Sequence, residues 1–427
     1  YGQGMWAASL RYHEGRFYIC FVANDTRKTY LYTSEKIDGP WKKQLIEGFY
    51  HDGSLLFDED GRNYIVYGND EIWITELNED LTAPKKDGLH RLLVSDHKNP
   101  ELGYEGSHIQ KINGYYYIFL IHSLRDRWMR TEACFYSDSL EGEFTGGDVL
   151  CDDRGYCGQG VAQGGIVDTP DGKWYAMLFQ DSGAVGRIPI LLPVTWKDHF
   201  PFFGQNGHVP EEIEVHSTRP GYIYQPLVGS DDFCNGLLPR WQFNHDPDPR
   251  YYHLDALQGT YTITTREVCT ELTQAVNTLT QRMSYPSCAA EVTVDASALK
   301  EGDVAGLCAL QSCYAAVGIT KHHGKYEVLM LDKKEDGILD MTEGTVVESH
   351  QMDFRLEADF CNMKDEARCY YRVNKGDWLP IGTVHKLYFK LDHFTGCRFG
   401  LFCYAAEETG GSACFRDFKY YDVDEIS

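Results

Sequence analysis

The stretch YEGSHIQKINGYYYIF (residues 104–119) contains the pattern that decides the fold. Its first half is an apolar, alternating segment that ends at Asn113-Gly114, a dipeptide that favours a tight turn between two antiparallel strands. The tyrosine-rich run that follows, up to Phe119, has the composition of a second strand. The stretch therefore predicts a β-hairpin, with Glu105 at the start of its first strand.

The same pattern occurs three more times in the first half of the chain, as RYHEGRFYICF (11–21), FDEDGRNYIVY (57–67) and DTPDGKWYAMLF (168–179). Each copy has a polar turn that ends in glycine and then an aromatic-rich strand. The turn glycines are Gly15, Gly61, Gly114 and Gly172, and they recur at intervals of about 46 to 58 residues. Short strands that repeat at this spacing predict the blades of a β-propeller.

One residue in each repeat precedes the turn glycine by nine positions. These residues are Trp6, Asp52, Glu105 and Gln163. Equivalent offsets predict equivalent places, so we expect all four on the innermost strands of successive blades, facing the central axis. Two carboxylates that converge there would repel each other unless one held a proton, and enzymes use such pairs to separate acid from base roles.

Each of these residues also has a purely structural interpretation. An acidic residue ahead of a hairpin is commonly a strand-end or turn residue, and a single tryptophan is more often part of a core than of a binding surface. The DEDG segment at 58–61 is a turn, because the other ligands of a calcium loop do not follow it. The shared offset of Asp52 and Glu105, together with their aromatic neighbours, favours a functional role for the pair.

Composition limits the classes of protein to which the chain can belong. With 427 residues, of which 14% are aromatic, and with little helical periodicity, the chain is expected to form two all-β domains. The net charge of −24 argues against nucleic acid and anionic membranes as partners. No apolar run approaches the roughly 18 to 20 residues that cross a bilayer. The start, YGQGMWAASL, lacks the features of a signal peptide.

The fourteen cysteines include no CxxC pair and no zinc-like cluster, so we interpret them as buried thiols, as at Cys20, Cys308 and Cys403. A reducing, cytoplasmic location fits this pattern best. Secretion is the alternative, because the N-terminus gives the impression of being incomplete. No metal is assigned and no cofactor is expected; a structural calcium ion remains open, although no motif supports one. Homo-oligomer formation is also left open.

Taken in order, the segments MWAASLRYHEGRFYICF, HDGSLLFDEDGRNYIVYG, YEGSHIQKINGYYYIF and VDTPDGKWYAMLFQDSGAVGRIPILLPVTW resemble family 43 of the glycoside hydrolases. This family consists of five-bladed propellers and includes β-xylosidases and α-L-arabinofuranosidases. The resemblance spans residues 1 to about 220. It implies that Glu105 is the general acid and that Asp52 tunes and orients that acid. It also implies that Trp6, His51 and Arg187 contact the sugar.

Two departures from the family pattern stand out. Many members have a histidine on the axis where this chain has Gln163, which we therefore expect to contact the substrate. The family's general base is an aspartate in the first blade, ahead of the tryptophan motif, and only four repeats are visible here. We therefore expect a further N-terminal blade of about 50 to 70 residues that carries the base.

After residue 226 the pattern changes to short alternating strands such as AAEVTVDA, YAAVGIT and KYEVLMLD, which predict a β-sandwich. The region resembles the concanavalin-like domain attached to many family 43 β-xylosidases. We therefore predict a catalytic propeller over 1–226 and a sandwich over 227–427. The predicted function is exo-acting, inverting release of xylose or arabinose from oligosaccharides. A β-xylosidase is favoured, and the alternatives are an α-L-arabinofuranosidase and a non-catalytic carbohydrate-binding propeller.

Overall fold

The computed structural model describes residues 3–422, and these residues form two compact units. The first unit ends at Tyr222 and the second begins at Ile223, with the segment Gly183–Gly186 assigned to the second by its contacts. The predicted boundary at residue 226 lies close to this change. The described residues contain strands and three short 3₁₀ turns but no α-helix, which confirms the all-β class.

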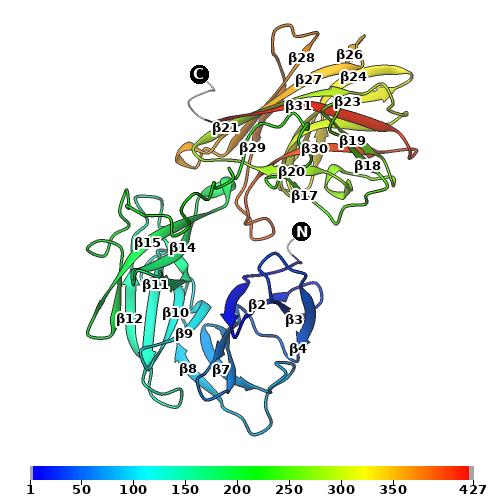
Figure 1. Cartoon of the computed structure of the whole chain (residues 1–427). Helices are drawn as coiled ribbons and strands as arrows, with labels where there is room; N and C mark the ends of the chain where they lie inside the picture. The colour runs from blue at the N-terminus through cyan, green and yellow to red at the C-terminus, as the bar shows by residue number, and fades with distance from the viewer. Residues whose placement is uncertain (1–2, 423–427) are drawn as a thin grey trace. The chain divides into compact units, whose positions relative to one another are not determined.

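The first unit contains four antiparallel sheets of four strands each, and each sheet begins with one of the sequence repeats (Figure 1). The strands of each sheet pair in sequence order, so the first strand lies at one edge and the fourth at the other. This is the arrangement of propeller blades. Four blades are therefore confirmed in the described residues, and the fifth stays a prediction.

The strands of these four sheets have the following bounds: β1 Ser9–His13, β2 Arg16–Ala23, β3 Lys28–Ser34, β4 Lys42–Ile46; β5 Ser54–Phe57, β6 Asn63–Asn69, β7 Glu71–Leu77, β8 His90–Ser95; β9 Glu105–Ile112, β10 Tyr115–Ser123, β11 Arg130–Ser137, β12 Thr145–Leu150; β13 Ala162–Asp168, β14 Trp174–Asp181, β15 Arg187–Lys197, β16 Phe200–Phe203. A 3₁₀ turn, η1 Gly183–Val185, lies between β14 and β15.

The predicted turns are present at the ends of the first strand pairs. Asn113 and Gly114 both have positive φ (51° and 87°), as the two-residue turn between β9 and β10 requires. Glu14 and Gly15, with φ of 46° and 79°, form the same kind of turn between β1 and β2. These turns fix the pairing register between the first and second strands of each sheet. That register determines which alternate side chains of the first strand point to each face of the sheet.

Hydrogen bonds link the inner strands of successive blades. Ser9 Oγ donates to the carbonyl of Gly53 at 2.7 Å, which joins β1 to the start of β5. Ser54 Oγ accepts from the backbone N–H of Ile109 at 3.1 Å, which joins β5 to β9. Arg11 in β1 donates to both Ser54 Oγ and the carbonyl of Ile109. The inner strands therefore hold their side chains in fixed positions around the axis.

The second unit is a sandwich of two antiparallel sheets. One sheet has the order β17-β20-β30-β22-β23-β24-β25, with β26 paired to β24, and the other has the order β18-β19-β31-β21-β27-β28-β29. In β27 buried and outward residues alternate, as expected for a strand with one covered face. His385 Nδ1 and Asp332 Oδ1 lie 2.7 Å apart and join the two sheets across the buried interior. The predicted β-sandwich is thus confirmed.

The elements of the second unit have these bounds: β17 Gln242–Phe243, β18 Tyr252–Asp255, β19 Thr260–Thr264, η2 Leu272–Gln274, β20 Leu279–Arg282, β21 Ser287–Asp295, β22 Asp303–Leu310, β23 Tyr314–His322, β24 Lys325–Lys333, β25 Leu339–Met341, β26 Thr345–Val347, β27 Gln351–Asp359, η3 Cys361–Met363, β28 Glu366–Val373, β29 Leu379–Lys386, β30 Arg398–Ala405 and β31 Ser412–Asp422.

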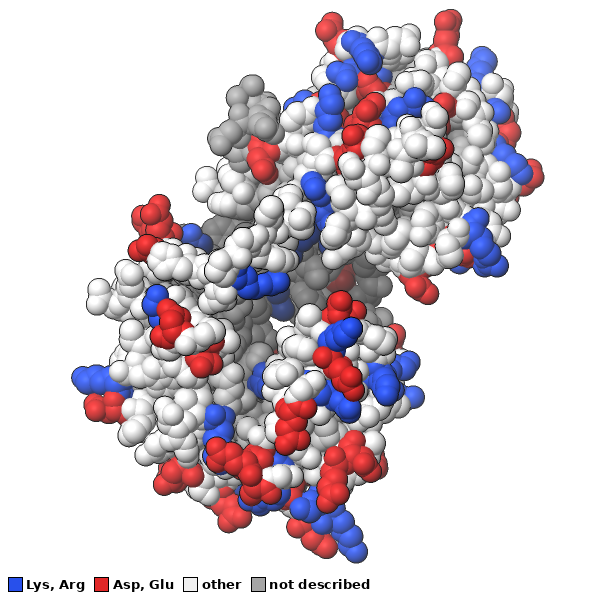
Figure 2. Space-filling model, viewed as in Figure 1, with Lys and Arg blue, Asp and Glu red and all other residues white. Residues whose placement is uncertain are grey.

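The cysteines only partly follow the prediction that they are buried thiols. All cysteines are free thiols, and most are buried, but Cys151, Cys157, Cys234 and Cys361 are exposed. Acidic side chains, with basic ones among them, are spread over the face of both units shown in Figure 2. Among residues 3–422 there is no helix with the length and apolar character needed to span a membrane.

Candidate active site

The residues that precede the turn glycines by nine positions lie at one end of the inner strands of their sheets. Asp52 lies two residues before β5, Glu105 begins β9, and Gln163 is the second residue of β13. Trp6 precedes β1, and its ring centre lies 5.9 Å from that of His51. The sequence offset therefore corresponds to one region of the first unit, where the blades contribute neighbouring side chains.

Asp52 and Glu105 bring two carboxylates together at this place. One oxygen of each lies within 4.8 Å of the other, and His51 Nε2 lies 3.7 Å from both Asp52 Oδ2 and Glu105 Oε2. The side chain of Asp52 is only 5% exposed, whereas that of Glu105 is 21% exposed. The two groups therefore differ in their access to a ligand, and their charges repel each other across a short distance.

The environment of Asp52 disfavours its ionised form. Burial raises the pKa of Asp52 to about 6, and the nearby Glu105 adds to this effect, while His51 and the backbone N–H of Gly106 oppose it. That N–H donates to Asp52 Oδ2 at 3.1 Å. Asp52 Oδ1 is buried with no hydrogen-bond partner among the described residues. Asp52 therefore carries a proton more readily than an ordinary aspartate at mildly acidic pH.

His51 lies between the two carboxylates and the tryptophan. The Glu105 carboxylate raises the pKa of His51, and partial burial acts in the opposite direction. The backbone carbonyl of His51 accepts a hydrogen bond from the N–H of Gly68 at 3.1 Å, which ties the residue to strand β6. A protonated His51 would compensate part of the negative charge of the pair.

The backbone around the pair is bent by three residues with positive φ. These are Asp52 (47°), Gly106 (66°) and Gln163 (66°). A Cβ atom on Gly106 would lie only 2.6 Å from Gln163 Cγ, so glycine is required here both for its backbone conformation and for space. Left-handed conformations at non-glycine residues are concentrated at functional sites, and this clustering therefore supports a functional role.

Glu132 in β11 supports Gln163, and sequence reasoning missed it. Its Oε2 accepts the backbone N–H of Gln163 at 2.7 Å, and its Oε1 has no partner among the described residues. Glu132 is fully buried, and this burial raises its pKa well above the usual range. No motif marks Glu132 in the sequence: it lies within the strand-like run RTEACFYS, 31 positions before Gln163.

Arg187 is held by partners that sequence reasoning also missed. Asp181 at the end of β14 lies between two arginines: its Oδ1 is 3.1 Å from Arg187 Nε, and its Oδ2 is 2.8 Å from Arg130 Nη1. Both guanidinium groups lie over the ring of Phe179, at 4.4 Å and 4.7 Å from its centre. Arg187 is close enough to Asp52 to lower the pKa of Asp52 slightly.

Asn69 is the third residue that was missed. It ends β6, and its Nδ2 donates to Glu105 Oε2 at 2.7 Å. Ser107, two residues after Glu105, donates through Oγ to the carbonyls of Asp52 (2.8 Å) and Val66 (3.0 Å). Glu105 is therefore fixed between the second and third blades, both through its own carboxylate and through the strand that follows it.

Two sequence models match the chain one after the other. The model of Glycosyl hydrolases family 43 matches residues 1–201, and the model of the Beta xylosidase C-terminal Concanavalin A-like domain matches residues 230–421. The chain belongs to glycoside hydrolase family 43. The resemblance noted in the four sequence repeats is therefore confirmed, and so is that of the second unit to the sandwich of family 43 β-xylosidases.

Several known proteins are similar to most or all of this chain. A putative beta-xylosidase of Xylanibacter ruminicola is 28% identical over 75% of this chain and 61% of its own length. A beta-xylosidase of Formosa agariphila is 25% identical over 99% of this chain and 78% of its own. The solved structure of a bifunctional GH43-CE protein of Bacteroides eggerthii has a TM-score of 0.88 and 41% identity, over 100% of this chain and 55% of that one. The chain thus spans little more than half of some relatives.

The family 43 site also contains the group of described residues whose atoms are close enough to surround a cation, namely His51, Asp52 and Glu105. The three atoms lie within 4.8 Å of one another. One of these atoms, Glu105 Oε2, also accepts a hydrogen bond from Asn69.

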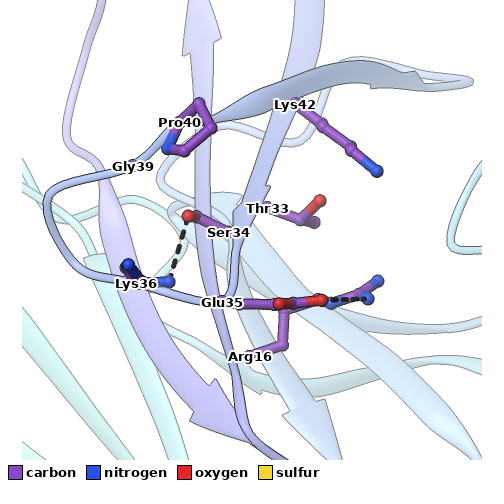
Figure 3. Close-up of a pocket in the computed structure, with 8 residues that line it drawn as sticks. All are labelled: Arg16, Thr33, Ser34, Glu35, Lys36, Gly39, Pro40 and Lys42. Carbon is purple, nitrogen blue, oxygen red and sulfur yellow. Dashed lines mark hydrogen bonds and ion pairs between the residues drawn. The ribbon is translucent and has the colours of Figure 1, made fainter.

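Two cavities of the family 43 unit lie at the other end of the blades, near the turn glycines. A cavity of about 260 Å³ lies in the first blade beside Arg16 and Lys42 (Figure 3). Its Arg16 is paired with Glu35 at 3.9 Å, and the backbone N–H of Lys36 donates to a serine hydroxyl. A second cavity, of about 270 Å³, is lined by the far ends of the inner strands. Neither cavity contains a candidate site residue.

Proposed function

We propose that this chain carries an exo-acting glycoside hydrolase that releases xylose or arabinose from xylo- and arabino-oligosaccharides with inversion, with β-xylosidase as the favoured activity. The observation that carries the proposal is the pair formed by the buried Asp52 and the more accessible Glu105, whose oxygens lie within 4.8 Å of each other. The names of the two curated relatives support the choice of sugar.

Glu105 acts as the general acid in this proposal. It is the more exposed carboxyl group of the pair, and its position at the start of β9 leaves it accessible to a ligand. As the bond between the anomeric carbon and the glycosidic oxygen breaks, Glu105 gives its proton to that oxygen, and the alcohol leaves neutral. The carboxylate that remains is stabilised by the Asn69 amide and by His51.

Asp52 is the second carboxylate of this proposal: one of its oxygens lies within 4.8 Å of a Glu105 oxygen, where it helps to orient the acid. Asp52 is too close to Glu105 to be the base of an inverting enzyme, because roughly 6.5 to 9.5 Å between the carboxyl groups is needed to admit the attacking water. A third carboxylate, outside this pair, therefore activates the water.

The remaining candidate residues bind and orient the sugar. Trp6 offers an aromatic face beside His51, and sugar rings pack against such faces through their C–H groups. Arg187 is held against Phe179 and Asp181, so its guanidinium group has a fixed orientation, and in this proposal it contacts the sugar. Gln163, fixed by Glu132, offers a neutral amide where a family histidine often lies.

The decisive experiment compares substrates with good and poor leaving groups. Glu105→Gln should reduce hydrolysis of xylo-oligosaccharides by about 10²- to 10⁴-fold but should spare a nitrophenyl xyloside, because only the first needs a proton at departure. A panel that includes a nitrophenyl arabinofuranoside identifies the preferred pentose, and NMR of the first product identifies its anomer. A sugar-induced thermal shift without turnover would instead indicate a carbohydrate-binding propeller. Equal loss on both substrates would remove Glu105 from the acid role.

A further inference from the structure

The hydrogen bond between Asn69 and Glu105 has a direction that the chemistry of the two groups fixes. The amide nitrogen of Asn69 can only donate, so Glu105 Oε2, 2.7 Å away, must accept. If the amide were turned over, its oxygen would face a carboxylate oxygen and repel it whenever Glu105 is ionised. In this orientation of the amide, which an ionised Glu105 requires, Oε2 is the acceptor.

The backbone holds Asn69 in this position from both sides. The preceding residue, Gly68, donates to the carbonyl of His51 at 3.1 Å. The following residue, Asp70, donates to the carbonyl of Tyr104 at 2.9 Å, and Tyr104 directly precedes Glu105. The turn between β6 and β7 is thus attached to the chain on either side of the carboxylate pair, so Asn69 has little freedom to move away from Glu105.

We propose that Asn69 is a positioning residue that keeps the catalytic proton of Glu105 on Oε1. When Glu105 is protonated, the bond from Asn69 excludes the proton from Oε2, which leaves Oε1 as the only oxygen that can present it to the glycosidic oxygen. After transfer, the same amide stabilises the carboxylate through a hydrogen bond to a charged acceptor. This inference rests on the proposed function and adds a residue to it.

The other charged groups around Glu105 do not supply this directional effect. The Asp52 carboxylate has no N–H group to donate to Glu105, and His51 Nε2 lies 3.7 Å from Glu105 Oε2, beyond hydrogen-bond distance. Arg130 acts on Glu105 through its charge but is held by Asp181. Within residues 3–422, the side chain that donates a hydrogen bond to only one of the two Glu105 oxygens is therefore that of Asn69.

The test uses Asn69→Ala and Asn69→Asp in the full-length protein, with Asn63→Ala at the other end of β6 as the matched control. Asn69→Ala should lower kcat on xylo-oligosaccharides by about ten- to a hundredfold, with little change in KM, and should spare a nitrophenyl xyloside. Asn69→Asp should lower kcat further and should move the alkaline limb of the pH–rate profile upward, because a second negative charge disfavours proton loss from Glu105. Asn63→Ala should leave kcat, KM and the pH–rate profile unchanged.

The outcomes separate this inference from the function on which it rests. If Glu105→Gln shows the leaving-group dependence but both Asn69 variants keep wild-type kcat and pH profile, Asn69 has no positioning role. An equal loss of kcat on both substrates in Asn69→Ala would also overturn it, since that indicates a general structural effect. If Glu105→Gln itself has no effect on either substrate, the proposed function fails first.

Discussion

Replacing Asp52 by Asn should stabilise the first unit at neutral pH while it harms the proposed reaction. The pKa of Asp52 rises from 3.8 to about 6 in the folded protein, mainly through burial. The pKa of Asp52 is higher in the folded protein than in the unfolded chain. The contribution of Asp52 to the free energy of unfolding is therefore largest below pH 3.8, and it is lost as the pH rises through about 6. A shift of roughly two units corresponds to about 3 kcal/mol, which sets the upper limit of the gain.

The stability of Asp52→Asn should exceed that of the wild type only at pH values at which wild-type Asp52 is ionised. For a unit of about 200 residues, ~3 kcal/mol corresponds to an increase of roughly 6 to 12 °C in Tm at pH 8, against little change at pH 4. Scanning calorimetry of both proteins from pH 4 to pH 8 measures this difference. An amide keeps the acceptor for the Gly106 N–H, so the local geometry can persist. The same Tm difference at both pH values, or a lower Tm at pH 8, would refute the reasoning.

Asp58 provides a control of the opposite sign in the same blade. Burial alone would raise the pKa of Asp58, but hydrogen bonds from Lys111 and Tyr116 outweigh it and hold the pKa below its usual range. Ionised Asp58 therefore stabilises the fold above its unfolded pKa, and this contribution is lost as the pH falls. Asp58→Asn should lower the Tm of the same transition at pH 8, which also assigns that transition to the first unit.

Two further variants test how the backbone and the arginine are held. Gly106→Ala should lower both kcat and Tm, because the added Cβ would lie 2.6 Å from Gln163. Gly114 has similar backbone strain but open space around it, so Gly114→Ala should cost only about 1 kcal/mol of stability and leave kcat unchanged. Asp181→Asn should raise KM for xylo-oligosaccharides about tenfold, because Arg187 would be held less firmly. Asp171→Asn, at an exposed ion pair of the same blade, should leave KM unchanged. Equal KM values in the two variants would contradict the role of Asp181 in holding Arg187.

Local patterns explain why so much of the fold followed from the sequence. The alternation of side chains and the turn dipeptides act within about ten residues, so the hairpins at Gly15 and Gly114 could be predicted directly. The repeated offset extended these local predictions to the ring that contains Asp52 and Glu105. The sandwich could be predicted in the same way, from alternating strands, without its strand order.

Two of the residues that were missed act across a distance that sequence patterns do not encode. Asn69 lies 36 positions from Glu105, and Glu132 lies 31 positions from Gln163. Each belongs to a strand behind the inner one, where the pairing register and the angle between blades decide which side chain reaches the axis. Asp181 also ends such a strand. Propensity and alternation identify these strands but give no information on their neighbours in the next blade.

The equal offset of Trp6, Asp52, Glu105 and Gln163 has a consequence for how such proteins diversify. Each blade provides the side chain at this offset to the common centre, and further strands of the sheet support it. A substitution at one of these positions can therefore change the chemistry of the centre while the sheets keep their packing and their turns. Specificity can thus evolve by single steps, one blade at a time, on a scaffold that does not need to be rebuilt.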